Sequence, residues 1–384
     1  MAPELTQEEI LRYSRHLLIP EVGLEGQEKL KAASVLIVGT GGLGSPIALY
    51  LAAAGVGRIG LVDYDVVDSS NLQRQIIHGS ERVGQLKVDS ARQRLLDLNP
   101  FIQIDTYNEV FSSQNAWQIA DGYDILVDGS DNFPTRYLLN DLAVLSGRPY
   151  VYGSIFRFEG QVSVFDARKG ACYRCLYPEP PPPGEVPSCA EGGVFGVLPG
   201  TVGTMQAAEV IKLILGIGEP LIDKLLLFDA LDVSLQSVRL RKNPKCRICG
   251  EQPEITQLID YEAFCGVPTR DVHAGLAGGD LDLEPVEILR RLQQGQALQL
   301  VDVRDPVEQQ VSTLPGAVLI PLPELMQRLD EVDRDRPVVL FCRTGVRSVR
   351  ALRLLAAQGY SQVYSLKGGI NAWADQVDPT IRKY

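Results

Sequence analysis

A short apolar stretch that runs directly into a glycine-rich turn constrains the fold of this chain most. Residues 34–38 read Ser-Val-Leu-Ile-Val, and residues 39–44 read Gly-Thr-Gly-Gly-Leu-Gly. The β-branched run predicts a buried strand, residues 45–54 predict a helix, and residues 58–62 predict a second strand. Strand, loop, helix and strand in this order form a parallel βαβ unit. The sequence therefore predicts an α/β fold with a doubly wound, Rossmann-type sheet.

Helical and strand patterns continue to alternate along the rest of the chain. Further helices are expected at residues 6–18, 84–98, 199–215 and 347–358, and further strands at residues 124–127, 297–301, 338–341 and 362–365. The proline-rich stretch 178–187 predicts a crossing loop. Residues 251–279 lack periodicity and predict a linker, so we expect one domain in residues 1–250 and a smaller α/β domain in residues 280–384.

Composition excludes several classes of protein. Hydrophobic residues make up 45% of the 384 residues, an ordinary globular value, and the formal net charge of -11 argues against a nucleic-acid-binding protein. The polar start predicts no secretory signal, and no apolar run is long enough to span a membrane. Seven cysteines, four of them in Cys-x-x-Cys pairs, favour a cytoplasmic protein with metal-binding and catalytic thiols.

The glycine loop predicts a site for a phosphorylated nucleotide. Its backbone N–H groups can approach phosphates without side-chain hindrance, and the N-terminus of the following helix favours an anion. Asp63 ends the next strand, where a carboxylate can accept hydrogen bonds from ribose hydroxyls. On these residues alone, an NAD-binding domain is at least as good an interpretation as an ATP site.

The stretch that follows favours a triphosphate. Residues 70–75 read Ser-Asn-Leu-Gln-Arg-Gln, and Lys87 opens the next expected helix. Attack at the α-phosphorus builds charge on the leaving pyrophosphate, which cations such as Arg74 and Lys87 would stabilise. Asp131, just beyond a strand, would hold Mg²⁺ against the phosphates. For a single Lys or Arg, a surface ion pair remains the alternative.

Four motifs in this order, namely Gly-x-Gly-Gly-x-Gly, Ser-Asn-Leu-Gln-Arg-Gln, Gly-Gln-x-Lys and Ser-Asp-Asn, resemble the MoeB/ThiF family over roughly residues 5–250. These proteins are adenylating relatives of ubiquitin-activating enzymes and share their fold. The resemblance implies adenylation by ATP of the C-terminal glycine carboxylate of a small ubiquitin-like carrier. It also implies a homodimer in which Arg15 reaches the partner's nucleotide. The residues that it assigns to nucleotide or Mg²⁺ are Gly39, Gly41, Gly42, Gly44, Asp63, Asp65, Ser70, Asn71, Leu72, Gln73, Arg74, Gln75, Lys87, Asp131 and Asn132.

Two cysteine pairs predict a metal site. Cys172 and Cys175 form one Cys-x-x-Cys pair, and Cys246 and Cys249 form the other. Each pair fits one tight turn, and four thiolates suit tetrahedral Zn²⁺. A redox disulfide is the alternative, although two well-separated pairs favour zinc. The family resemblance also implies structural zinc.

Cys189 is an isolated cysteine that follows the proline-rich loop. A lone cysteine is usually a small buried apolar residue. Here the glycines at 192 and 193 leave access to the sulfur. In the sulfurtransferase-fused relatives, the matching cysteine captures the activated carboxylate as a thioester or resolves an acyl-disulfide, and we expect Cys189 to be catalytic.

Residues 342–347, Cys-Arg-Thr-Gly-Val-Arg, predict a reactive thiol between a strand and a helix. Backbone N–H groups at the helix N-terminus, together with Arg343 and Arg347, would stabilise a thiolate or persulfide at Cys342. A buried structural cysteine is disfavoured by the two arginines. A phosphatase loop would place Arg six residues after the cysteine, but position 348 is Ser.

The C-terminal segment, roughly residues 280–384, resembles a rhodanese domain. Supporting stretches are Val-Asp-Val-Arg-Asp at 301–305, Leu-Pro-Gly-Ala at 314–317 and Leu-Lys-Gly-Gly-Ile-Asn-Ala-Trp at 366–373. Ser312-Thr313 stands where rhodaneses often carry Gly-His. The resemblance implies that Cys342 carries sulfane sulfur.

Together these features predict a bifunctional adenylyltransferase and sulfurtransferase that converts a carrier's C-terminal glycine into a thiocarboxylate. The expected sulfur source is a cysteine desulfurase or another persulfide donor. The carrier's route, whether molybdopterin, thiamine, cysteine or tRNA thiolation, stays open. A nicotinamide oxidoreductase would leave Arg74, Lys87 and the cysteine pairs unexplained, and a silent scaffold would not need Cys342 or Asp131.

Overall fold

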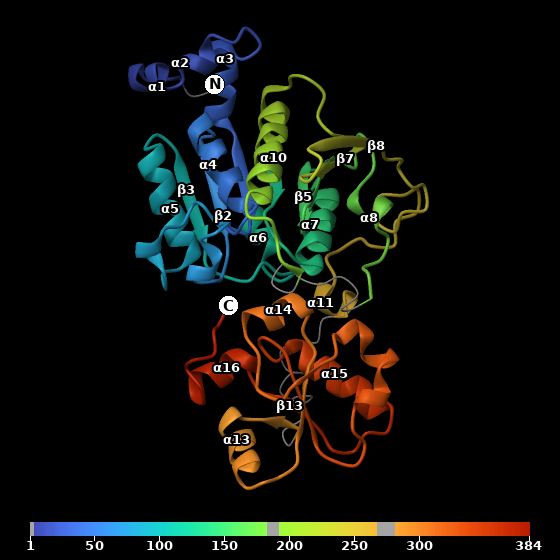
Figure 1. Cartoon of the computed structure of the whole chain (residues 1–384). Helices are drawn as coiled ribbons and strands as arrows, with labels where there is room; N and C mark the ends of the chain where they lie inside the picture. The colour runs from blue at the N-terminus through green and yellow to red at the C-terminus, as the bar shows by residue number, and fades with distance from the viewer. Residues whose placement is uncertain (1–3, 183–191, 267–280) are drawn as a thin grey trace. The chain divides into compact units, whose positions relative to one another are not determined.

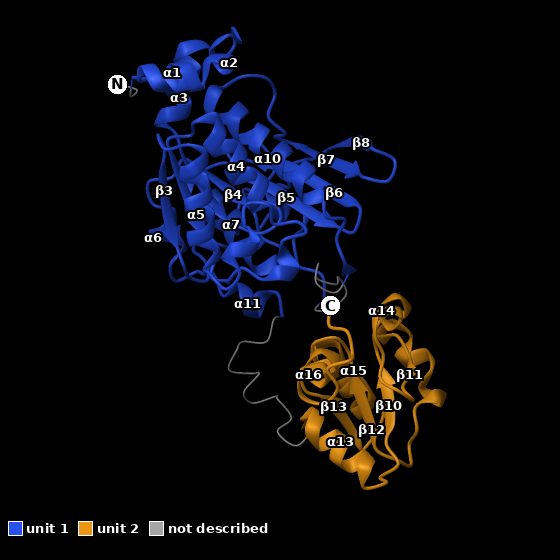
Figure 2. Ribbon diagram, turned by 60° about the vertical axis from the view of Figure 1, so that its left-hand side comes forward, with its two compact units in different colours: residues 1–267 blue, residues 268–384 orange. Residues whose placement is uncertain are grey.

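A computed structural model describes residues 4–182, 192–266 and 281–384. The chain divides into two compact units, residues 1–267 and 268–384, which are coloured separately in Figure 2. Each unit has its own sheet and its own hydrophobic core. None of the described helices is both long and apolar enough to cross a membrane.

The first unit is built on an eight-stranded sheet with the order β3-β2-β1-β4-β5-β6-β7-β8. The strands β3, β2, β1, β4 and β5 pair in parallel, and β6, β7 and β8 continue the sheet in antiparallel fashion. Their bounds are Ser34–Val38 (β1), Arg58–Val62 (β2), Gln103–Tyr107 (β3), Ile125–Asp128 (β4), Tyr150–Phe156 (β5), Glu159–Phe165 (β6), Lys224–Asp229 (β7) and Ser234–Arg239 (β8). The predicted doubly wound sheet is confirmed.

Helices cover both faces of this sheet, and Figure 1 shows the longest, α10, beside α4. Their bounds are Gln7–Arg12 (α1), Ser14–Leu17 (α2), Gly23–Ala32 (α3), Gly44–Ala54 (α4), Lys87–Leu98 (α5), Ala116–Ala120 (α6), Phe133–Ser146 (α7), Tyr173–Leu176 (α8), Leu198–Leu215 (α10) and Tyr261–Phe264 (α11). Along β1, Val35 and Ile37 pack with α4, α5 and α10, whereas Leu36 and Val38 pack with α6 and α7. Side chains alternate between the faces of a strand, so β1 is apolar throughout because both faces are covered.

The helix expected at residues 6–18 is divided in the structure. Thr6 caps α1 with the expected capping box to Glu9, and the helix ends at Tyr13 before α2 begins. The Tyr13 ring is buried and its hydroxyl accepts a hydrogen bond from Asn99 Nδ2 at 2.8 Å. This anchoring fixes the junction of α1 and α2 against the end of α5.

Part of the expected linker packs into the first unit. Ile255, Tyr261 and Cys265 are all buried, and Tyr261 and Cys265 lie in the core that contains α7. Among the described residues of this segment, 251–266, α11 is the one regular element and has four residues, which is why no periodicity is seen there.

The second unit contains a five-stranded parallel sheet with the order β11-β10-β12-β13-β9. The strands are Asp282–Leu283 (β9), Gln299–Asp302 (β10), Val318–Leu319 (β11), Val338–Phe341 (β12) and Val363–Leu366 (β13), and the helices are Pro285–Gln293 (α13), Pro306–Val311 (α14), Val346–Ala357 (α15) and Gly369–Gln376 (α16). One core lies against α15 and another against α13 and α16. A small α/β unit was expected here and is confirmed.

Candidate active sites and metal centre

The strand order of the first unit creates a crevice between β1 and β4. The chain runs from β1 to β2 and β3 on one side and then crosses to β4 on the other. Ligands of doubly wound proteins bind at such a switch point, beyond the carboxyl ends of the strands. Val38 pairs with Asp128 at this end, so the segments that follow the two strands start side by side.

Three glycines pack tightly in this crevice. Gly39 has φ +96°, and a Cβ added there would lie 2.6 Å from the carbonyl oxygen of Gly129. A Cβ added at Gly44 would lie 1.9 Å from the carbonyl oxygen of Gly39. Side chains cannot be accommodated at these positions, so the backbone stays bare where α4 begins, as phosphate binding by N–H groups requires.

Asp63 fixes the glycine loop from the end of β2. Its Oδ2 accepts hydrogen bonds from Thr40 N at 2.8 Å and Thr40 Oγ1 at 2.9 Å, and its Oδ1 accepts one from Asp65 N at 3.0 Å. The sequence assigned Asp63 to ribose. The structure adds a second task, because this carboxylate orients the loop that would face the phosphates.

The segment 70–75 brings Arg74 and Gln75 to the loop. A Cβ added at Gly42 would lie 3.7 Å from Arg74 Cγ, and one added at Gly41 would lie 3.5 Å from Gln75 Nε2. The turn begins at the 3₁₀ helix Ser69–Asn71, whose Asn71 carbonyl accepts from the N–H groups of Arg74 and Gln75. Asn71 therefore shapes the turn, and the side-chain stem of Arg74 lies beside Gly42 while its Nη1 donates to the Ser70 carbonyl at 3.3 Å.

Lys87 joins the same site through Asp65. Its side chain is 7% exposed, and its Nζ lies 2.8 Å from Asp65 Oδ2. The backbone N–H of Asp65 in turn donates a hydrogen bond to Asp63 Oδ1. A surface ion pair was the alternative for this lysine. The structure does show an ion pair, with half-exposed Asp65, although Lys87 itself is buried, so the nucleotide role of Lys87 stays a prediction.

Asp131 and Asn132 follow β4. Asp131 is exposed and lies two residues beyond Gly129, whose backbone packs against Gly39, so it follows directly on the turn that touches the glycine loop. Asn132 caps α7, because its Oδ1 accepts from Thr135 N at 2.9 Å. The cap supplies a structural reason for Asn132 besides nucleotide binding.

Arg15 is remote from the nucleotide crevice of its own chain. It lies on α2, and the neighbouring Tyr13 contacts Gly55 at the C-terminal end of α4. The glycine loop lies at the other end of that 11-residue helix, which is about 16 Å long. Arg15 is exposed at this end of α4 and is therefore separated from the glycine loop, to which the resemblance assigns the nucleotide.

His78 is a loop-supporting residue that the sequence did not reveal. Its Nε2 lies 3.1 Å from the Thr40 carbonyl oxygen and its Nδ1 lies 2.9 Å from Ser90 Oγ. Burial lowers the pKa of His78, so the neutral ring donates to Thr40 from Nε2 and accepts from Ser90. A single histidine outside any motif gave no signal for this role.

A buried polar cluster beneath the crevice was also missed. Asp128 accepts hydrogen bonds from Ser130 N, Ser130 Oγ and Tyr150 Oη at 2.6 to 2.9 Å, and Arg136 Nε lies 3.8 Å from its Oδ2. Burial raises the pKa of Asp128 although Arg136 opposes the shift. The cluster fixes the turn that carries Asp131, and the position of Asp128 at a strand end was the only available signal.

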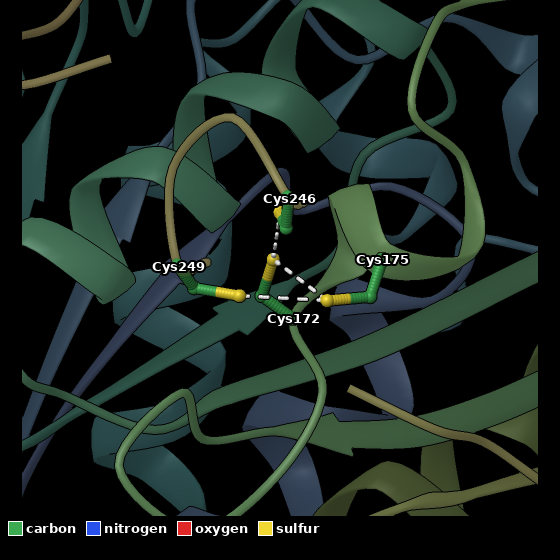
Figure 3. Close-up of side chains that lie close together, drawn as sticks. All are labelled: Cys172, Cys175, Cys246 and Cys249. Carbon is green, nitrogen blue, oxygen red and sulfur yellow. Dashed lines mark hydrogen bonds between the residues drawn. The ribbon is translucent and has the colours of Figure 1, made fainter. Parts of the chain in front are cut away.

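The four paired cysteines form one cluster, with their sulfurs pointing toward one another in Figure 3. The Sγ atoms lie within 4.8 Å of one another, and the Cys175–Cys249 and Cys172–Cys246 separations are 3.4 and 3.6 Å. A hydrogen bond from Cys172 lowers the pKa of Cys175 to about 6, and the same contact raises the pKa of Cys172. Four crowded thiols with shared protons are a donor set that fits a tetrahedral soft cation.

The predicted thiol loop lies between β12 and α15. Cys342 is 1% exposed, and its Sγ accepts a hydrogen bond from Gly345 N at 3.2 Å. Ser348 Oγ lies 3.8 Å from the sulfur and is held by the Gly345 carbonyl at 2.9 Å. The helix N-terminus therefore faces the sulfur, as expected.

Arg347 is already paired within this loop. Its Nη1 and Nη2 lie 2.6 and 2.7 Å from the two carboxylate oxygens of Glu308, at the start of α14. Burial disfavours the charge of Arg347, but the hydrogen bonds to Glu308 outweigh it and raise its pKa. Part of the positive charge expected beside Cys342 is thus neutralised, which the sequence did not reveal.

Cys189, which the sequence predicted to be catalytic, lies outside the described residues.

Two families match the chain. The ThiF family matches residues 13–248, and the rhodanese-like domain matches residues 284–376. Among curated proteins, the chain is 50% identical to the "Probable adenylyltransferase/sulfurtransferase MoeZ" of Mycobacterium tuberculosis over 100% of this chain and 97% of that protein. It is 45% identical to the "Adenylyltransferase and sulfurtransferase MOCS3" of Drosophila yakuba over 99% of this chain and 86% of that protein.

Solved structures similar to the chain include E. coli MccB with ATP and MccB with MccA-N7isoASN. Their TM-scores are 0.55 and 0.57 at 25% identity, over 62% of this chain and 73% or 75% of theirs. These likenesses agree with the α/β fold of the chain. The chain therefore belongs to the ThiF family, carries a C-terminal rhodanese-like domain, and is a bifunctional adenylyltransferase and sulfurtransferase.

Proposed function

We propose that this enzyme uses ATP to adenylate the C-terminal glycine of a small ubiquitin-like sulfur carrier and then converts that carboxylate into a thiocarboxylate. The observation that supports this most is one chain with both a cation-lined glycine crevice and a thiol loop at a helix N-terminus. The printed names of the relatives pair the same two activities.

In the adenylation step, the carrier's carboxylate attacks the α-phosphorus of ATP and pyrophosphate leaves. The bare backbone from Gly39 to Gly44 binds phosphate oxygens, and Arg74 and Lys87 stabilise the charge that develops on pyrophosphate. Asp131 would hold Mg²⁺, which neutralises phosphate charge when it is bound. The product has AMP as a good leaving group.

Zn²⁺ is the proposed occupant of the four-cysteine cluster. The cluster joins α8 to the segment after β8, and it lies within its own apolar cluster of buried residues. Closed four-thiolate sites are structural, because no coordination position is left for a substrate. We assign the cluster to folding and give it no step in the reaction.

Sulfur transfer is proposed to proceed through Cys342. Its thiolate takes sulfane sulfur from a persulfide donor such as a cysteine desulfurase, and the donor thiolate leaves. The Cys342 persulfide then attacks the acyl-adenylate and expels AMP, which leaves an acyl-disulfide. Attack by the Cys189 thiolate on the Cys342 sulfur releases the thiocarboxylate and forms a Cys189–Cys342 disulfide, which a thiol reductant must reduce. Such thiol chemistry suits the cytoplasm.

A homodimer is proposed to complete the nucleotide site with Arg15 of the partner. Its distance from the crevice of its own chain supports this role. Four large apolar side chains in the same segment, from α1 to the start of α3, are exposed: Leu11 (67%), Leu18 (74%), Ile19 (44%) and Leu24 (53%). An apolar surface of this kind is typical of an interface between subunits.

The Cys342→Ala variant tests the sulfur-transfer step. We expect it to form carrier acyl-adenylate at the parent rate and to lose thiocarboxylate formation by at least about 100-fold, since the persulfide cannot form. The measurement is the carrier mass after incubation with ATP and a persulfide donor, without free bisulfide. Cys265→Ala, which removes a different buried thiol, should behave like the parent. Thiocarboxylate formed by Cys342→Ala at the parent rate would contradict the proposal.

A further inference from the structure

Tyr384, which follows α16, lies against the thiol loop although it belongs to no motif. Its hydroxyl accepts a hydrogen bond from Arg304 Nη1 at 2.8 Å and donates one to Glu308 Oε1 at 2.8 Å. The same Glu308 oxygen lies 2.7 Å from Arg347 Nη2. The phenol therefore links an arginine after β10 to the carboxylate that holds Arg347.

The ring of Tyr384 also contacts Arg343, the other arginine of the thiol loop. The Arg343 guanidinium carbon lies 5.2 Å from the ring centroid, within cation–π range. Arg343 and Arg347 flank the loop that begins at Cys342. One side chain thus contacts Arg343 directly and Arg347 through Glu308.

The support beneath Tyr384 is rigid. Arg304 is fully buried, pairs with Asp302 at 2.6 Å and donates to the Ser312 carbonyl at 2.8 Å. Burial and the hydrogen bond to Glu308 raise the pKa of Tyr384, so the hydroxyl stays protonated and keeps donating. The phenol is held between the buried Arg304 and the partly buried carboxylate of Glu308, which defines its position.

We infer that Tyr384 is a positioning residue for sulfur transfer, which sets the two arginines beside Cys342 so that an anionic sulfur donor can bind. This inference rests on the proposed role of Cys342 as the sulfur carrier. With thiosulfate as the donor, the Cys342 thiolate attacks the sulfane sulfur and sulfite leaves with the electron pair of the broken S–S bond. Cyanide then takes that sulfur as thiocyanate and restores the thiolate.

Tyr384→Phe removes the hydroxyl and keeps the ring. In the thiosulfate:cyanide assay with the full chain, we expect KM for thiosulfate to rise about tenfold and kcat to change by less than about twofold. The KM of the parent should increase with ionic strength more steeply than that of the variant, because well-placed arginines attract the dianion.

Tyr360→Phe is the matched control. Its hydroxyl also donates inside the second unit, to the carbonyls of Leu329 at 2.9 Å and Val332 at 3.3 Å, and neither acceptor belongs to the thiol loop. We expect parent KM and kcat for it. Parent kinetics in Tyr384→Phe, or the same KM rise in Tyr360→Phe, would overturn the inference. Persistent activity in Cys342→Ala would instead overturn the proposed function, and this inference with it.

Discussion

Single side chains in this enzyme hold the glycine loop, whose backbone N–H groups are proposed to bind phosphate. His78 holds the Thr40 carbonyl and Asp63 holds the Thr40 N–H and hydroxyl, so the glycine loop is clamped from two sides. A buried neutral histidine suits this task because its two nitrogens differ, one donating and one accepting. The protonation state of His78 is therefore coupled to the folded state.

Stability near neutral pH should depend on His78. Burial holds its folded pKa below the unfolded value of about 6.5, so the unfolded chain binds more protons at lower pH. The stabilising contribution is complete above about pH 6.5 and is lost as the pH falls below it, with a slope of at most about 1.4 kcal/mol per pH unit. Thermal unfolding of the parent and of His78→Gln between pH 7.5 and 5.5 measures this difference.

Between pH 7.5 and 5.5, the free energy of unfolding of His78→Gln should fall less than that of the parent. His16→Gln changes a histidine that contacts Gln27 rather than the glycine loop, and it controls for the loss of an imidazole. Equal pH slopes in the parent and in His78→Gln would show that His78 does not couple protonation to folding.

At the scale of elements, the segment of the first cysteine pair, α8, contacts the helices α7 and α11 through one arginine. Arg174, between Cys172 and Cys175, donates from Nε and Nη2 to the two oxygens of Asp141 on α7 at 2.8 Å each. The hydroxyl of Tyr261 on α11 donates to the same carboxylate at 2.9 Å. The Arg174 guanidinium also lies 4.6 Å from the ring centre of Phe264. The four-cysteine cluster and α11 are thus parts of one packed assembly.

Replacing Cys172 with Ser should release the metal and destabilise this assembly. Binding of structural zinc contributes to folding, and a lost ligand should lower Tm of the first unit by on the order of 10 °C. Zinc content by elemental analysis and Tm by calorimetry give the result. Cys265→Ser, a buried cysteine outside the cluster, should keep one zinc per chain. A parent protein that contains no zinc would refute the assignment.

Sequence patterns predicted the elements best where local periodicity was strong. β1, β2 and β12 match the expected bounds, because short apolar runs that are followed by glycine, aspartate or cysteine leave little choice. Contacts between distant residues were not predictable. Glu308 and Tyr384 are 76 residues apart, and nothing in their flanking residues indicates that they meet. The packing of residues 251–266 was missed for the same reason, since their burial follows no period.

At the scale of the whole molecule, two separately cored units carry the two chemistries. The predicted nucleotide residues lie in the unit that ends at residue 267, and Cys342 lies in the unit that begins at residue 268. Among the described residues, each buried cluster is made of residues from one unit. Damage to one chemistry should therefore leave the other intact.

Asp131→Ala tests this independence. We expect carrier-dependent ATP–pyrophosphate exchange to fall at least about 100-fold, because the variant lacks the carboxylate that would hold Mg²⁺ against the leaving pyrophosphate. Thiosulfate:cyanide activity should stay at the parent level. Asp121→Ala makes the same change in an exposed residue before β4, at the opposite end of that strand, and should retain exchange. Normal exchange in Asp131→Ala would remove Asp131 from the reaction.

The near-complete burial of Cys342 has a consequence for how loaded sulfur reacts. Small dissolved thiols and oxidants react with exposed sulfur atoms, and Cys342 offers 1% of its surface to them. In the proposed Cys342 persulfide, this burial would shield the sulfur atom that belongs to the cysteine. We therefore expect a small thiol to take the outer sulfur rather than to form a mixed disulfide with Cys342, so that the thiolate is left ready to be charged again.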